Sequence, residues 1–133
     1  MKKIALILAF CAISLCLQAQ AQKSEKDRQK QFFEAIDTQV DRLTELLDLE
    51  EWQAFYVDSI LTHDYAALQQ EFDYLQKSKV TNSDLFYDIQ DKWSEQIYNS
   101  LHEVFTEDQW AKYLKSGAAR EKKARDKRAA KKN

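Results

Sequence analysis

Hydrophobic residues recur along this chain with the 3.6-residue period of an α-helix, in four stretches separated by polar segments. The first stretch predicts a helix from about Ser24 to Leu47 whose other sides are charged. Its apolar face consists of Phe32, Ile36, Val40, Leu43 and Leu47. A single apolar face predicts a helix that packs on one neighbour and exposes its remaining sides to solvent.

The second stretch predicts a longer helix, from about Leu49 to Lys77, with apolar stripes on two different sides. One stripe consists of Val57, Leu61, Leu68, Phe72 and Leu75, and the other of Trp52, Tyr56, His63, Ala67 and Tyr74, joined by Ile60. Such a helix is about 40 Å long at 1.5 Å per residue. Two stripes predict two sets of neighbours, and a chain this short can supply only one of them.

The third stretch predicts a helix from Ser83 to about Val104, with Ser83 as its cap and a polar linker before it. Tyr87 and Tyr98 are eleven residues apart and therefore share one face of this helix, beside its main apolar stripe. A fourth helix is predicted to begin after Thr106. It either ends at Ser116–Gly117 or continues into the basic end of the chain.

Two similar helix-start motifs stand between these stretches: LDLEEWQ at 47–53 and FTEDQW at 105–110. In the second motif, Thr106 and Gln109 have the spacing of a capping box, in which each side chain bonds the other residue's backbone N–H. An apolar residue, Phe105, precedes that box.

The first motif places Leu49 four residues before Gln53, which matches the spacing of Phe105 and Gln109 in the second. Glu50 stands where the second motif has threonine, so we expect Asp48, with Glu51 three residues later, to cap this helix.

The chain contains one glycine and no proline, and folds rich in strands need such residues at many turns. The sequence therefore predicts an all-α fold of about four helices, one of them long and two-faced. The first 21 residues have the pattern of a cleaved signal peptide, with Lys2 and Lys3 before a 14-residue apolar run and Ala19-Gln20-Ala21 after it. We expect a helical domain at 22–115 and a basic C-terminal tail at 116–133.

A signal peptide predicts export, with the periplasm as the first choice of compartment and secretion as the second. Both cysteines, Cys11 and Cys16, lie inside the apolar run. The mature chain is therefore expected to have no disulfide, no thiol nucleophile and no thiolate ligand for a metal.

Charge divides the chain into an acidic body and a basic tail. Residues 22–114 contain 20 Asp and Glu against 9 Lys and Arg, whereas residues 115–133 contain 9 Lys and Arg against 2 acids. Export argues against nucleic acid as the partner of the tail. We interpret the tail as a solvated, partly helical segment, and as a candidate for weak contact with an acidic membrane surface.

No pattern of residues indicates catalysis, a cofactor or a metal site. The two histidines, His63 and His102, lie in different predicted helices, and neither has a serine or cysteine nearby at a motif spacing. Each has an acidic residue next to it, but adjacent residues on a helix point to different sides. We expect solvated or partly buried histidines and no enzyme activity.

The aromatic residues outside the main stripes are the candidates for a binding or dimer surface. A single chain cannot cover every side of the long helix, so part of this apolar surface should remain available to a partner. The candidates are Trp52, Tyr56, Ile60, Tyr74, Tyr87 and Tyr98.

With both motifs placed, the chain resembles the Spy/CpxP-like periplasmic proteins, whose hallmark is a pair of LTxxQ motifs. The residues that carry the resemblance are Leu49 and Gln53 in the first motif and Phe105, Thr106 and Gln109 in the second, with Glu50 in place of a threonine and Phe105 in place of a leucine. The resemblance spans about 43–115 and implies an all-α, cradle-shaped antiparallel dimer. Proteins of that family act without ATP as chaperones for unfolded envelope proteins, as stress-response regulators or as metal-responsive proteins.

From this resemblance and the exposed aromatic residues, we expect an exported homodimer that binds unfolded or partly folded envelope proteins reversibly. Two alternatives remain open at this point. One is a regulatory protein that docks on an envelope sensor, and the other is a metal-responsive periplasmic protein.

Overall fold

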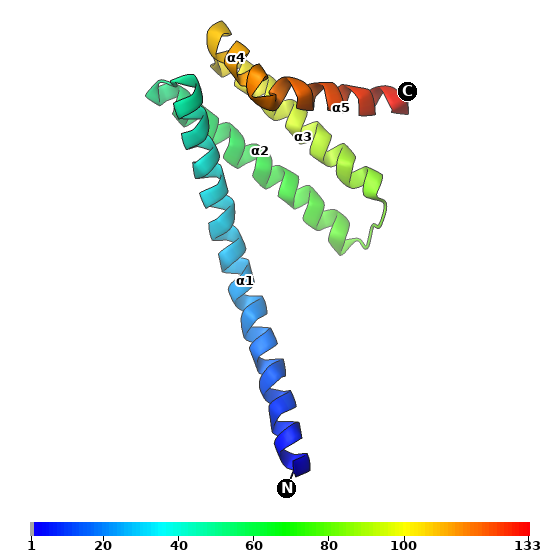
Figure 1. Ribbon diagram of the computed structural model, residues 1–133. Coiled ribbons are helices and arrows are strands. Elements are labelled where there is room, and N and C mark those ends of the chain that lie inside the picture. Colours follow the sequence, from blue (N-terminus) through cyan, green and yellow to red (C-terminus); the bar gives the residue numbers. More distant parts are fainter. Residues whose placement is uncertain (1) are drawn as a thin grey trace. The chain divides into compact units, whose positions relative to one another are not determined.

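The computed structural model in Figure 1 describes the backbone from Lys2 to Asn133 and the side chains from Ser24 onward. The predicted signal peptide at 1–21 therefore lies outside the described side chains. The chain divides into two compact units, 1–35 and 36–133.

All the regular secondary structure described between Lys2 and Asn133 is helical, in agreement with the all-α prediction. The elements in chain order are α1 (Lys2–Leu47), α2 (Glu51–Lys77), α3 (Ser83–Val104), α4 (Glu107–Tyr113), a π-helical turn (Leu114–Ala118) and α5 (Ala119–Lys132). The predicted start of the first helix at Ser24 is wrong, because the helix is already present at Lys2. Its predicted end at Leu47 is confirmed.

The turn between α1 and α2 does not use the cap that the sequence suggested. Asp48 has a positive φ of 51°, and the N–H of Leu49 bonds the carbonyl of Thr44 at 3.1 Å. This is the left-handed ending common to α-helices, in which the residue after the helix reverses the chain. Asp48 therefore ends α1, and Glu50 is the N-cap residue of α2.

Helices α2 and α3 lie side by side in the 36–133 unit, joined by the linker at 78–82 (Figure 1). The linker turns at Lys79, which has a positive φ of 55°. Asn82, rather than the predicted Ser83, caps α3, since its side chain accepts a hydrogen bond from the N–H of Asp84 at 3.0 Å.

The core of the 36–133 unit is formed by side chains that recur at helical spacing on each helix. Buried apolar residues come from α1, α2, α3, both helix junctions and the end of the chain: Ile36, Leu43, Leu47, Leu49, Val57, Leu61, Ile97, Leu101, Phe105, Trp110 and Ala118. The stripes predicted on α1, α2 and α3 thus contribute to one core.

The end of the chain is helical and kinked. Helix α4 passes through the π-helical turn into α5, so the second of the two predicted alternatives for this segment is found. Gly117, with a φ of 127°, forms the kink. Residues with a side chain rarely adopt this conformation, and the only glycine of the sequence occupies the position that requires it.

Candidate functional site

The two motif glutamines, Gln53 and Gln109, hydrogen-bond each other although they are 56 residues apart. Gln53 Nε2 donates to Gln109 Oε1 at 2.7 Å, and Gln109 Nε2 donates to Gln53 Oε1 at 3.1 Å. Gln53 Nε2 also donates to the carbonyl of Val104 at 3.0 Å, at the last residue of α3. These bonds hold the α1–α2 junction against the α3–α4 junction.

Each glutamine also caps the start of its own helix. The N–H of Glu50 donates to Gln53 Oε1 at 3.0 Å, and the N–H of Thr106 donates to Gln109 Oε1 at 2.9 Å. Thr106 Oγ1 accepts in return from the N–H of Gln109 at 3.3 Å, which completes the capping box predicted there. Backbone groups that a helix start leaves unpaired are thereby satisfied within the motifs.

Aromatic rings pack around Trp110 beside the second motif. The imidazole of His102 stacks on the Trp110 ring with centroids 4.1 Å apart, and Tyr98 meets the same ring edge-to-face at 4.8 Å. The ring centroid of Tyr113 lies 5.3 Å from that of Trp110 and 5.6 Å from that of Phe105. This cluster fixes α4 on the end of α3.

The burial of Tyr113 in this cluster raises its pKa to about 12, with a further contribution from the negative charge of Glu121. The neutral phenol is therefore the form that the fold favours.

A second aromatic cluster lies on the surface at the start of α2. Trp52, Phe55 and Tyr56 are 52%, 67% and 53% exposed, respectively. Tyr56 meets both other rings edge-to-face, with centroids 6.1 Å from Trp52 and 5.9 Å from Phe55. We call these three residues the aromatic patch. The sequence pointed to Trp52 and Tyr56 but missed Phe55, although its spacing of three residues from Trp52 places it on the same side of the helix.

The other residues predicted for a binding or dimer surface lie in different surroundings. Tyr74 and Tyr87 are 71% and 57% exposed, whereas Ile60 is half-buried. Tyr74 borders a shallow hollow between α2 and α3 that Leu75 and Ile89 also line. Ile60 lies one helical turn after Tyr56 on α2, whereas Tyr87 belongs to α3.

Tyr98 is partly buried, because its ring packs on Trp110 and lies under the guanidinium of Arg125, 5.5 Å from the ring centroid. It therefore belongs to the contact between α3 and the C-terminal helix.

Asp64 is a buried carboxylate on α2. It is 4% exposed, lies 2.8 Å from His63 Nδ1 and accepts a longer bond of 3.3 Å from Gln96 Nε2. His63 reaches its neighbour, so the expectation that adjacent residues would point apart is wrong here. Among the described residues, no group of three or more His, Cys, Asp or Glu side chains is arranged to hold a metal ion.

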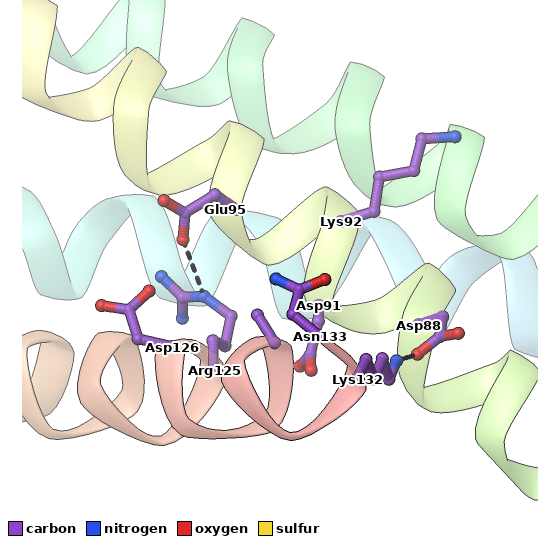
Figure 2. A pocket seen from close by; sticks show the side chains of 9 residues that line it. Asp88, Asp91, Lys92, Glu95, Arg125, Asp126, Lys132 and Asn133 are labelled. Carbon is purple, nitrogen blue, oxygen red and sulfur yellow. Dashed lines mark hydrogen bonds and ion pairs between the residues drawn. The ribbon is translucent and has the colours of Figure 1, made fainter.

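The basic helix α5 packs against acidic residues of α3, which the sequence analysis did not predict (Figure 2). The acidic residues Asp88, Asp91 and Glu95 follow one side of α3, and we call them the acidic strip. Their partners on α5 are Lys132 for Asp88, Arg128 for Asp91, and both Arg125 and Lys122 for Glu95. The two helices therefore pair in antiparallel order.

This contact changes the interpretation of the basic tail as a solvated segment. Arg125 is only 8% exposed, and its Nε donates to Glu95 at 3.1 Å. Hydrogen bonds from Lys122 to Asp126, and then to Glu95, raise the pKa of the Lys122 ammonium. The cations at 122, 125, 128 and 132 have a spacing compatible with that of the strip, but the further cations of α5 make other registers equally compatible.

None of the helices searched among the described residues is long and apolar enough to span a membrane. Compared with protein-family models, curated proteins and solved structures, the chain has no match in any of the three.

Proposed function

We propose that this protein is a chaperone-like protein that binds unfolded or partly folded envelope proteins without ATP, and that it acts in the periplasm as a homodimer. The observation that carries the proposal is the aromatic patch, in which three large rings remain more than half exposed. Soluble proteins seldom leave adjacent rings in water unless the surface serves an interaction.

The chemistry of the patch suits reversible binding of many sequences. Trp52 and Tyr56 offer large contact areas together with polar atoms that water can solvate when no client is bound. The Trp52 indole N–H already donates to Glu50 Oε2, so the ring is held in place before a client arrives. A pre-positioned side chain loses less conformational entropy on binding.

The resemblance of the two motifs to LTxxQ motifs supports the same proposal. The glutamine bonds fix the α1–α2 junction, and Trp52 directly precedes Gln53 while Phe55 follows it by two residues. A rigid junction next to the patch would keep the rings exposed instead of letting them collapse onto the body. The cradle-shaped dimer that the resemblance implies would place two such patches in one assembly.

The test is suppression of aggregation of two unrelated unfolded proteins by the mature chain, measured by light scattering. The variant Trp52→Ala/Phe55→Ala/Tyr56→Ala should lose most of the suppression. A matched control, Asp58→Ala/Ser59→Ala/Gln69→Ala, alters the same helix and should retain it. Equal suppression by both variants would contradict the role of the patch.

A regulator that docks on one envelope partner remains the alternative, since a patch of only three rings could also serve a single fixed partner. The same assay distinguishes the two. A chaperone suppresses aggregation of both test proteins, whereas a dedicated regulator suppresses neither.

A further inference from the structure

The acidic strip of α3 is a second surface with its own chemistry, separate from the aromatic patch of α2. Its carboxylates, on Asp88, Asp91 and Glu95, are spaced three and four residues apart and so lie along one side of the helix. Successive positions on such a side are about 5–6 Å apart, which suits an elongated ligand with several cations rather than one small ion.

Helix α5 shows what kind of ligand fits this strip. Arg128 binds Asp91 through two hydrogen bonds, Nε to Oδ2 and Nη2 to Oδ1, each 2.7 Å long. Lys122 and Arg125 both reach Glu95, at 2.8 and 3.1 Å. The strip thus recognises a basic helix whose cations recur every three or four residues, and Figure 2 shows the two helices facing each other along it.

Charge, more than apolar packing, holds α5 in place. Its only apolar residues are alanines, and the rest of the helix is charged. The buried Nη2 of Arg125 has no hydrogen-bond partner among the described residues, so the pairing is incomplete even in the docked helix. The pairs of Arg128 and Lys132 lie near the surface, where ion pairs are individually weak and are screened by salt, whereas the Arg125 side chain is buried.

Helix α5 contributes no large apolar side chain to the core, and Arg125 is its one buried residue. The kink at Gly117 separates it from α4, whereas α2 and α3 are held together by buried apolar residues such as Leu61 and Leu101. Loss of the α5 contact would expose the acidic strip and leave the α2–α3 pair intact.

We propose that the acidic strip is a binding surface for basic polypeptide segments, and that α5 is the internal occupant which such a segment displaces. The partner is a chain with lysines and arginines three or four residues apart, as in α5 itself. The acidic strip and its displaceable helix α5 go beyond the proposed function, because they depend on the α3–α5 contact and not on the aromatic patch.

The experiment uses the full chain and a fluorescently labelled peptide of residues 119–133 as the probe. Variant Arg125→Glu/Arg128→Glu releases α5 by reversing two charges that face the strip. The matched control, Lys123→Glu/Lys127→Glu, reverses two exposed charges for which the described part of the chain shows no ion pair, and it has the same net charge. Peptide binding is measured by fluorescence anisotropy at low salt.

The release variant should bind the peptide about tenfold more tightly than the wild type or the control, because the docked α5 reduces the fraction of molecules with a free strip. Raising ionic strength from about 0.05 M to about 0.3 M should weaken this binding, since the Debye length shortens. Adding Asp91→Asn/Glu95→Gln to the release variant should return the affinity to the control level.

Equal binding by the release variant and the control would overturn the proposal, and so would binding that survives neutralisation of the strip. Tight binding by the wild type would show that α5 is not the occupant. Circular dichroism checks that each variant unfolds in the same transition as the wild type. If Arg125→Glu/Arg128→Glu is less stable than the wild type, the single variant Arg128→Gln, which removes the two bonds to Asp91, is compared with Lys127→Gln instead.

Discussion

Gln53 and Gln109 join the two helix junctions through a pair of amide–amide hydrogen bonds, 2.7 and 3.1 Å long. Each amide also bonds the backbone at the start of its own helix. Each glutamine therefore caps its own helix and at the same time links the two junctions. Gln53 is 2% exposed, so its amide depends on these bonds and not on water, whereas Gln109 is partly exposed. The motifs are therefore a structural clamp beside the aromatic patch.

The clamp predicts that the two glutamines are energetically coupled. Gln53→Ala should lower the free energy of unfolding by about 2–3 kcal/mol, because it leaves the Val104 carbonyl and the Gln109 amide without their partner. Gln109→Ala should cost less, since this side chain is partly exposed. Urea unfolding of both single variants and the double variant measures the coupling, expected at about 0.5–3 kcal/mol. Additive effects would show that the two amides act independently.

The kink before α5 predicts a strong effect of a small substitution. Gly117→Ala should disfavour the docked conformation by about 1–3 kcal/mol, because a Cβ makes a φ of 127° unfavourable. A Cβ would meet no atom within 4 Å at this position, so the cost arises from the backbone alone. Amide hydrogen exchange should become faster in α5 and remain unchanged in α2. Lys115→Ala, in the same turn, is the control, and equal exchange in both variants would contradict this reading of the kink.

Tyr113 predicts a loss of stability at alkaline pH. Its pKa is about 12 in the folded protein, against an ordinary value of 10.0. Between these values the unfolded chain releases the proton while the folded chain keeps it, so stability falls as pH rises from about 10 to about 12. Across that window the ionisation of Tyr113 lowers the free energy of unfolding by about 2–3 kcal/mol, and below the window it has no effect.

The measurement is urea unfolding of the wild type and Tyr113→Phe at about pH 8, about pH 10 and about pH 11.5. These values lie below the window, at its start and near its end. All other ionisable groups are the same in the two proteins, so the difference between the two curves isolates Tyr113. An identical decline in both proteins would show that its phenol titrates normally.

Much of the fold could be predicted from local signals. The apolar period and the Thr106–Gln109 box were sufficient for the limits of α3 and the start of α4, because caps act within one helical turn. The prediction of Asp48 as the cap of α2 is wrong, since Glu50 is the N-cap residue although glutamate is uncommon at that position. Asp48 instead takes the left-handed conformation that ends α1.

The contacts between distant segments could not be predicted in the same way. No local pattern indicates that Gln53 would meet Gln109, because both already have a capping task within their own helix. The α5 contact is similar: its cations lie on all sides of the helix, so their spacing alone allows several registers against Asp91 and Glu95. Phe55 was missed because its exposure depends on which side of α2 faces the core.

Direct binding to an unfolded chain is the sharpest test of whether the aromatic patch binds unfolded proteins. A permanently unfolded, fluorescently labelled protein is titrated with the mature chain and with Trp52→Ala/Phe55→Ala/Tyr56→Ala, and the anisotropy is recorded. We predict micromolar-range binding by the wild type and a loss of about tenfold or more in the triple variant, as expected when the aromatic anchors of an interface are truncated. Unchanged affinity in a folded triple variant would contradict the account.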